Sequence, residues 1–241
     1  MSQYMYTNLV WSDEFNGTSI DTNNWGFDVG GGGWGNNELQ YYTDRSENAR
    51  IEDGSLIIEA RNESYGTNSY TSAKLISKNK QTFSYARIAA RMRLPYGKGI
   101  WPAFWTLGNN IDTVGWPKCG EIDIMELVGG GEGFDDTIHG TVHYYDNGNA
   151  QTPGGEIQLA TGNFCDGYHE FSVEWNANVI NWYMDGYRYY TAPVTGSMDE
   201  FINNPQYIIF NIAVGGNWPG RPDGTTVFPQ KMYVDWVRVY Q

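Results

Sequence analysis

The sequence of 241 residues has little positive charge, few cysteines and no long apolar run. Lys and Arg number 15 against 28 Asp and Glu, so the formal net charge of −13 disfavours nucleic acid and anionic membrane surfaces as partners. No apolar stretch approaches the roughly 18 residues that span a bilayer. The two cysteines, Cys119 and Cys165, allow at most one disulfide and are too few for a cysteine zinc site. Uncharged sugars remain possible partners.

The first residues, MSQYMY, lack the basic region and the apolar stretch of a secretory signal. This start fits either a cytosolic protein or a trimmed secreted one. The length suits one large domain or two small ones, and no linker rich in Pro, Gly or Ser divides the chain. We therefore expect one domain over residues 1–241.

Helical periodicity is almost absent, and short runs of β-forming residues alternate with Gly, Asn and Asp. Asp185 and Gly186 predict a two-residue hairpin turn, and only 197–202 resembles a short helix. The pattern favours an all-β antiparallel sandwich or jelly roll. The strands expected are 55–62, 73–78, 84–94, 101–107, 121–127, 137–145, 169–175, 179–184, 187–191, 207–214 and 232–240.

Three acids fall within six residues of an otherwise apolar stretch, GEIDIMEL at 120–127. Strand alternation places Glu121 and Asp123 on one face, whereas strict alternation would send Glu126 to the opposite, apolar face. A buried charge without a partner would cost several kcal/mol there. We therefore predict a β-bulge around Ile124 and Met125 that returns Glu126 to the face of the other two acids.

With this bulge the two glutamates are about 13 Å apart along the strand at roughly 3.3 Å per step. On a concave sheet the side chains can lean inward until the carboxyl groups are about 5–5.5 Å apart, the separation of a retaining glycosidase. Asp123 lies between them and supplies a like charge that separates their titrations, so that one glutamate stays protonated and the other ionised.

The neighbours of the acids argue against a merely solvated strand face, because Trp101, Trp105 and Trp116 precede them and His139 and His143 follow. The two histidines share a strand face, which leaves zinc binding as an alternative. The intervening Gly-Thr-Val is β-like, however, and the glutamate of a helical zinc motif is missing. Hydrogen bonding of the histidines to the acids or to sugar hydroxyls is therefore favoured. Cys119, beside the acids, fits a packed small residue better than a nucleophile.

The segment 121–126, EIDIME, resembles the signature of glycoside hydrolase family 16 in the five-residue spacing of laminarinases, and its extra Met125 points away from the lichenases. The resemblance extends over nearly the whole chain. Further segments that carry it are 11–17 WSDEFNG, 36–43 NNELQYYT, 99–105 GIWPAFW, 139–144 HGTVHY, 211–216 NIAVGG and 234–239 VDWVRV.

The resemblance implies a curved jelly roll with an open cleft along its concave face. It implies a retaining endo-β-1,3-glucanase in which Glu121 is the nucleophile, Glu126 the general acid/base and Asp123 the assisting carboxylate. Pyranose rings stack on aromatic side chains, while their hydroxyls need fixed polar groups. The residues expected to bind a β-glucan are Trp101, Trp105, Trp116, Arg91, Asn37, Trp34, His139 and His143.

The resemblance also implies a structural Ca²⁺ on the convex side at Glu14, Gly54 and Asp235, with no cofactor for catalysis. It further implies a secreted, extracellular and monomeric enzyme. Two alternatives remain open: a mixed-linkage β-1,3-1,4-glucanase, and a non-catalytic glucan-binding module on the same fold. Members of the second class usually lack the glutamates, whereas Glu121 and Glu126 are both present.

Overall fold

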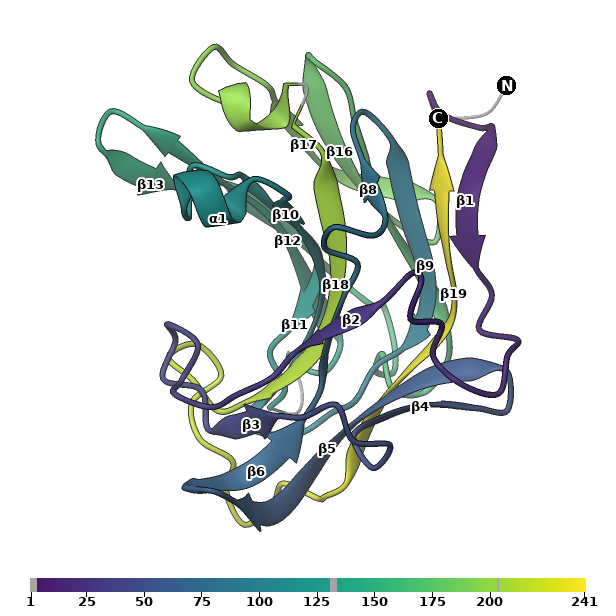
Figure 1. Cartoon of the computed structure of the whole chain (residues 1–241), viewed down its shortest axis with the longest axis vertical. Helices are drawn as coiled ribbons and strands as arrows, with labels where there is room; N and C mark the ends of the chain where they lie inside the picture. Colours follow the sequence, from purple (N-terminus) through teal and green to yellow (C-terminus); the bar gives the residue numbers. More distant parts are fainter. Residues whose placement is uncertain (1–3, 131–133, 203) are drawn as a thin grey trace.

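The structure is a computed structural model that describes residues 4–130, 134–202 and 204–241. Its strands form one sheet of ten and one of nine strands, which pack face to face and curve together (Figure 1). The pairing is predominantly antiparallel, and β3 and β6 pair in parallel. The predicted all-β sandwich of jelly-roll type is confirmed.

The ten-stranded sheet is the outer, convex layer, with β17-β16-β15-β9-β19-β5-β6-β3 as its main order. β1 pairs at β19 and β4 at β5. The strands are β1 Leu9–Asp13, β3 Gln40–Tyr42, β4 Ala49–Glu52, β5 Ser55–Tyr65, β6 Asn68–Ser72, β9 Arg87–Arg93, β15 His169–Trp175, β16 Val179–Met184, β17 Tyr187–Pro193 and β19 Gln230–Tyr240.

The nine-stranded sheet is the inner, concave layer, with β13-β12-β11-β10-β18-β7-β2 as its main order. β14 pairs with β12 and β8 with β18. The strands are β2 Gly26–Asp28, β7 Lys74–Ile76, β8 Thr82–Phe83, β10 Ile100–Gly108, β11 Glu121–Leu127, β12 Thr137–Asp146, β13 Asn149–Gln151, β14 Gly154–Gln158 and β18 Gln206–Val214.

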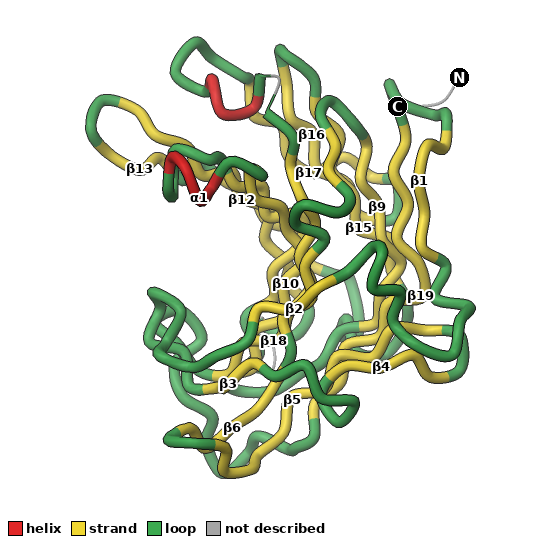
Figure 2. The backbone as a smooth tube through the Cα atoms, in the orientation of Figure 1, coloured by secondary structure: helices red, strands yellow, loops and turns green. Residues whose placement is uncertain are grey.

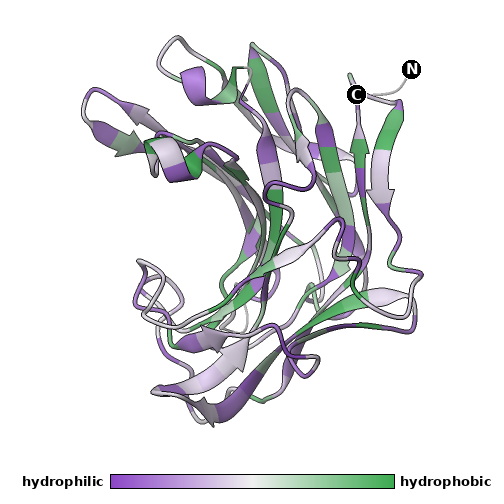
Figure 3. Ribbon diagram, viewed as in Figure 1, coloured by the Kyte–Doolittle hydropathy of each residue, from purple (hydrophilic) through white to green (hydrophobic). Residues whose placement is uncertain are grey.

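Side-chain alternation on β10 and β18 divides core from cleft. Phe104 stacks on Phe210 in the core, with ring centroids 4.8 Å apart and planes 10° apart. The opposite phase of β10 presents Trp101 and Trp105 to the concave face. The hydrophobic residues that form the core accordingly lie mainly on the strands of the two sheets (Figure 3). Period-two alternation thus explains both the apolar core and the side chains on the concave face.

Helical structure is confined to short turns near the rim of the concave face (Figure 2). The predicted helix at 197–202 is a 3₁₀ turn, η1 Asp199–Phe201, and a four-residue helix, α1 Ile111–Val114, was not predicted. Neither helix among the described residues has the length or apolarity to cross a membrane. The hairpin turn is confirmed, because Asp185 and Gly186 both have positive φ, 48° and 78°.

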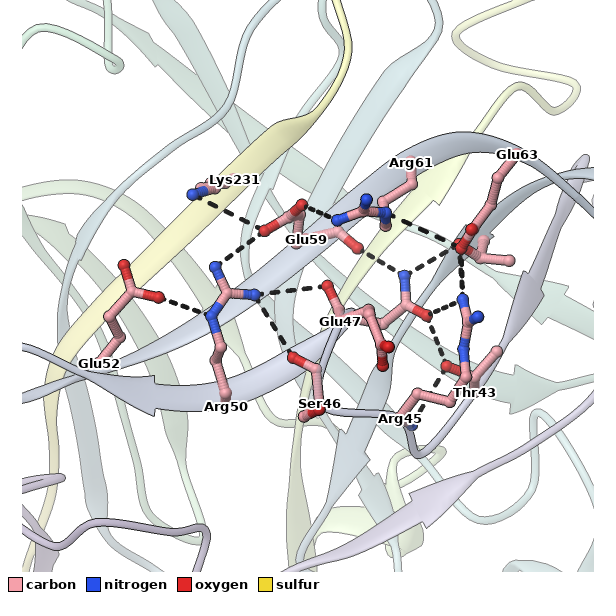
Figure 4. Close-up of polar contacts among 12 residues, drawn as sticks. Thr43, Arg45, Ser46, Glu47, Arg50, Glu52, Glu59, Arg61, Glu63 and Lys231 are labelled. Atoms are coloured by element: carbon pink, nitrogen blue, oxygen red, sulfur yellow. Dashed lines mark hydrogen bonds and ion pairs between the residues drawn. The ribbon is translucent and has the colours of Figure 1, made fainter.

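The outer face of β5 carries alternating acids and arginines, shown in Figure 4. Glu59, only 3% exposed, accepts from Arg61 Nη1 at 2.6 Å and from Arg50 Nη2 at 2.9 Å. Glu63 accepts from Arg45 and from the Thr71 hydroxyl. We call Glu59 and Glu63 the outer row. Each acid in it contacts at least one arginine.

The first and last strands are neighbours. β1 pairs with β19, and the Gln241 amide donates to the Asn8 carbonyl at 2.9 Å. β1 and β19 lie together at one edge of the molecule, on the side away from the concave face (Figure 1).

Candidate active site

The concave face holds a cavity lined by all three acids of β11. We call Glu121, Asp123 and Glu126 the cleft row. Aromatic and polar side chains from β3, β7, β10, β18 and the 34–38 segment complete the lining. They include Trp34, Glu38, Tyr42, Lys74, Trp101, Trp105 and Asn211.

A bulge in β11 brings the cleft row together. Against β12, Asp123 pairs with Thr141 and Glu126 with His139, so two residues of β11 oppose one of β12. The register with β10 slips at the same place. The predicted bulge at residues 124–125 is confirmed, and Glu126 lies on the cleft face rather than in the core.

An indole N–H donates to each glutamate of the cleft row. Trp116 Nε1 lies 2.9 Å from Glu121 Oε2, and Trp101 Nε1 lies 3.0 Å from Glu126 Oε1. Trp116 is 52% exposed, so its ring presents a broad face to solvent as well as a hydrogen bond to the acid. Both indoles can therefore orient a carboxylate and offer a surface for a sugar ring.

His143 links Glu121 and Asp123. It lies on β12, where it pairs with Glu121 of β11. Its Nε2 lies 2.8 Å from Asp123 Oδ2 and 3.5 Å from Glu121 Oε1. Asp123 is 3% exposed, so this imidazole supplies the compensating charge that a buried carboxylate needs.

Burial raises the pKa of every carboxyl group in the cleft row. The pKa of Glu126 rises to about 7 through burial and then through the charge of Glu121. Burial and a neighbouring carboxylate likewise raise the pKa of Glu121 and of Asp123. Burial alone would lower the pKa of His143, but its hydrogen bond with Asp123 and the nearby carboxylates raise it to about 9. The row therefore retains protons at neutral pH.

A buried cation orders one wall of the cleft. Lys74 Nζ lies 4.7 Å from the Trp34 ring centroid, 5.1 Å from that of Trp105 and 3.0 Å from Asp28 Oδ2. Cation–π contact with both indoles fixes their planes relative to each other.

A hydrogen-bond chain continues that wall. Trp105 Nε1 donates to Asn211 Oδ1 at 2.6 Å, and Asn211 Nδ2 donates to the Tyr42 hydroxyl at 3.0 Å. Tyr42 reaches Glu38, whose pKa is raised by burial. The chain holds polar groups in fixed positions along the trough, as recognition of sugar hydroxyls requires.

A further pair of aromatic rings, Trp101 and Trp218, lies close to Glu126 and His139. Trp218 packs edge-on against Trp101 with centroids 5.7 Å apart, and its centroid is 4.9 Å from that of His139. Trp218 is 46% exposed, which leaves its ring accessible.

The sequence profile of glycosyl hydrolases family 16 matches residues 35–238, most of the chain. The chain belongs to this family. The family 16 chain is 44% identical to the beta-glucanase of Rhodothermus marinus over 97% of its length and 85% of that protein. It is 41% identical to the clotting factor G alpha subunit of Tachypleus tridentatus over the same share, but spans only 34% of that longer protein.

The solved catalytic domain of an endo-1,3-beta-glucanase (laminarinase) from Thermotoga petrophila has the same fold as this family 16 chain. The TM-score is 0.86 at 44% identity, and 97% of each chain is covered.

The structure brings together most of the residues predicted for the family 16 cleft. Asn37 lies at the rim, where its Nδ2 donates to Asn217 Oδ1 at 2.8 Å. His139 lies beside Trp218, and its Nδ1 is 3.4 Å from Glu156. Both can therefore contribute to the rim of the cleft. The other predicted positions within the site are Trp34, Trp101, Trp105, Trp116 and His143.

The prediction that Arg91 lines the cleft is wrong. Arg91 belongs to β9 in the outer sheet and lies in the opposite phase to Ile88, Ala90 and Met92, which face the core. Its guanidinium pairs with Asp235 and stacks on Tyr168, with 4.6 Å to the ring centroid. Strand alternation can place Arg91 on the side away from the core, but it cannot tell which sheet the strand joins.

The predicted calcium ligands do not form an open cage of oxygens. Pairing with β19 brings the neighbours of Glu14, Gly54 and Asp235 to one stretch of that strand. Glu14, however, makes a two-pronged ion pair with Arg238, both contacts at 2.9 Å, and Asp235 pairs with Arg91. The pair with Arg238 also lowers the pKa of Glu14. Both side-chain carboxylates are therefore already paired with guanidiniums in the structure.

Among the described residues, the one group of acids and histidines compact enough for a metal is Glu121, Asp123 and His143, with donor atoms within 4.8 Å of one another. The raised pKa of His143, about 9, keeps a proton on the nitrogen that a metal would need. The group therefore fits a hydrogen-bonded charge cluster better than a metal centre.

The two cysteines are unpaired thiols in the structure, so the disulfide left open by the sequence does not form. Cys119 is buried, and burial followed by the charge of Glu121 raises its pKa to about 11. A thiol with this pKa is a poor nucleophile, as expected for a packed residue.

Several cleft residues were not predicted as site residues, although their segments were noticed. Glu38, Tyr42 and Asn211 lie in the NNELQYYT and NIAVGG segments, and Trp218 and Lys74 lie outside the quoted motifs. Asn211 is a polar residue within an otherwise apolar strand, between Phe210 and Ile212. This exception to the pattern could have marked it as a site residue. Nothing local distinguishes Lys74 from a surface lysine.

Proposed function

We propose that this chain is a retaining endo-β-1,3-glucanase that cleaves internal bonds of laminarin-like glucans. The observation that carries the proposal is the cleft row itself: two glutamates on one face of a bulged strand, in a trough walled by indoles. The likeness to a laminarinase catalytic domain over nearly the full chain supports the β-1,3 linkage. The family membership supports hydrolysis of a glycosidic bond.

In the proposed mechanism Glu126 is the general acid/base. Its raised pKa, about 7, keeps it protonated below neutral pH, so that it can donate a proton to the glycosidic oxygen as the bond breaks. Trp101 fixes the carboxyl group through its indole N–H. After the first half of the reaction Glu126 is a carboxylate that takes a proton from water.

Glu121 is the proposed nucleophile. Its carboxylate attacks the anomeric carbon from the face opposite the leaving group and forms a glycosyl ester, which the activated water then hydrolyses with net retention. Attack requires the ionised form. His143 and Trp116 stabilise the charge on the ionised form of Glu121.

Sugar binding is assigned to the two aromatic walls. Trp34 and Trp105, ordered by Lys74, form one wall. Trp101 and Trp218 form the other. We propose that successive glucose rings stack along these walls, with Glu38, Asn37, His139 and Asn211 available to hydroxyls. An extended trough accepts the middle of a chain, which supports endo action.

Mixed-linkage β-1,3-1,4-glucan is the second candidate substrate, since the same walls could stack a chain of either linkage. A purely binding role is less well supported, because the buried, protonated cleft row serves no purpose in a passive platform.

The proposal is tested by incubating the protein with laminarin, barley-type mixed-linkage glucan and agarose in parallel. We expect the highest kcat/KM on laminarin, early products several sugars long, and a newly formed β-anomer in proton NMR. A newly formed α-anomer would exclude the retaining mechanism, and activity confined to mixed-linkage glucan would favour the second candidate.

We also propose that the enzyme acts outside the cell as a monomer. A polymeric glucan does not cross membranes, and a net charge of −13 opposes self-association. Activity recovered from the culture medium of the source organism and a mass near 27.3 kDa by light scattering are the expected results.

A further inference from the structure

The bulge of β11 is contacted from the opposite sheet. Trp182, fully buried on β16, donates its indole N–H to the backbone carbonyl of Asp123 at 2.8 Å. Asp123 is the last residue before the register slips against both neighbouring strands. The hydrogen bond therefore reaches across the core to the place where the sheet ladder is interrupted.

Gly140 provides the room for this contact. It lies on β12 between His139 and Thr141, opposite the bulge. A Cβ at residue 140 would lie 2.5 Å from both Trp182 Cδ1 and the Tyr189 hydroxyl, so any larger residue would crowd the indole and that hydroxyl. Tyr190 packs on the other side of Trp182, with centroids 5.1 Å apart. The indole is thus held between β12 and β17.

We propose that Trp182 is a positioning residue for catalysis: its N–H fixes the bulge that keeps Glu126 on the cleft face beside Glu121. A strand that relaxed to regular alternation would turn Glu126 toward the core. Even a displacement of about 1 Å in a reacting group can cost roughly 10²-fold in rate. This inference rests on the proposed function, because it assigns Trp182 a role through the general acid/base.

Trp175 offers a matched control. It is also a fully buried tryptophan of the outer sheet, on the neighbouring β15, and its indole N–H has no hydrogen-bond partner among the described residues. Trp175→Phe and Trp182→Phe remove the same atoms from the same core. Only the second change removes a hydrogen bond to the bulge.

The experiment compares kcat, KM and melting temperature of both variants on laminarin. We expect Trp182→Phe to lower kcat about 10- to 100-fold with KM within about twofold, and Trp175→Phe to leave both within about twofold. The basic limb of the pH profile should also move to higher pH in Trp182→Phe, because a Glu126 turned toward the apolar core is more strongly desolvated and its pKa rises further. Equal kcat for the two variants would overturn the proposal.

A second pair of variants guards against a failure to fold. Gly140→Ala leaves the indole unchanged but crowds it, together with the Tyr189 hydroxyl, and should also lower kcat. Gly167→Ala, where a Cβ meets nothing within 4 Å, should not lower kcat. Replacing Trp182 by benzothienylalanine, which has sulfur in place of the N–H, keeps the size of the ring. Unchanged kcat in that protein would also overturn the proposal.

A substrate-free readout separates this inference from the proposed function. With ¹³C-labelled glutamate, NMR follows the titration of Glu126 directly, and we expect its midpoint to rise in Trp182→Phe but not in Trp175→Phe. If the wild-type protein fails to cleave any glucan, the proposed function is wrong while this titration still tests the contact. If the wild type cleaves laminarin and the midpoint does not move, the inference alone is wrong.

Discussion

The cleft row on β11 and the outer row on β5 use the same kind of residue in opposite ways. Glu59 and Glu63 are partnered by arginines, and the pKa of Glu63 is lowered by its hydrogen bond with Thr71 and by Arg45. In the cleft row the partners are two indole N–H groups and one imidazole, and the pKa of Glu126 rises to about 7. A row of acids becomes reactive when burial is not matched by full charge compensation.

The largest expected effect is on turnover. Glu121→Gln should lower kcat on laminarin by more than about 10³-fold, because the amide cannot form the glycosyl ester. The matched change in the outer row, Glu59→Gln, should leave kcat within about twofold. It should lower the melting temperature instead, because Arg50 and Arg61 lose their buried partner, at a cost of about 1–2 kcal/mol given that both arginines are partly exposed. Activity retained in Glu121→Gln would remove the distinction between the rows.

The next effect concerns His143, which contacts two acids of the cleft row. The charge of His143 lowers the pKa of Glu121 and Asp123, so His143→Gln should raise both. Since Glu121 reacts as a carboxylate, the acidic limb of kcat/KM should move to higher pH by about one unit, a loss of about tenfold at pH 5. A pH profile from 4 to 9 measures this. His169→Gln, which removes an imidazole paired with Asp185 outside the cleft, should leave the profile unchanged.

The stability of the fold should change with pH in opposite directions through Glu126 of the cleft row and Glu63 of the outer row. Glu126, whose pKa is raised by folding, stabilises the fold when protonated, and that contribution is lost as pH rises through about 7. Glu126→Gln should therefore raise stability at pH 8 by about 2 kcal/mol and have little effect at pH 5.

For Glu63, whose pKa is lowered by folding, the stabilisation is present above its unfolded pKa and is lost as pH falls. Glu63→Gln should lower the melting temperature at pH 8 and have less effect at pH 4. Thermal unfolding at both pH values measures the two variants. Shifts of the same sign would show that the rows do not differ in charge compensation.

The smallest expected effect tests whether the charge of Glu59 is compensated mainly by the two arginines that contact it. Lys231 Nζ lies 3.7 Å from Glu59, farther than the two arginines, and its side chain is 31% exposed. Lys231→Met should change stability by less than about 0.5 kcal/mol. A larger loss in urea unfolding would mean that the outer row depends on its total charge rather than on the two arginine contacts.

The sequence predicted eleven of the strands, the hairpin at Asp185 and the bulge, because each follows from a local rule. The short strands β1, β2, β3, β4, β6, β8, β13 and β14 were not predicted. Alternation of apolar and polar residues gives the face, and an acid out of phase demands an extra residue, as at Glu126. These rules need only neighbours along the chain.

The positions that could not be predicted depend on contacts between distant strands. Arg91 has the correct phase for an exposed face, but whether that face is concave or convex is decided by the pairing of β9 with β15 and β19. Lys74 acquires its role from Trp34 and Trp105, which lie far from it in sequence. The partner of the Trp182 N–H is likewise a carbonyl 59 residues away.

The adjacency of β1 and β19 has a consequence for how such a fold can be combined with others. Because the two ends leave from one edge, behind the concave face, a tether attached to either end need not pass over the trough (Figure 1). A neighbouring module could be joined before Leu9 or after Tyr240 without closing the entrance to a long polysaccharide. The same placement would allow the fold to be inserted as a domain into a surface loop of another protein.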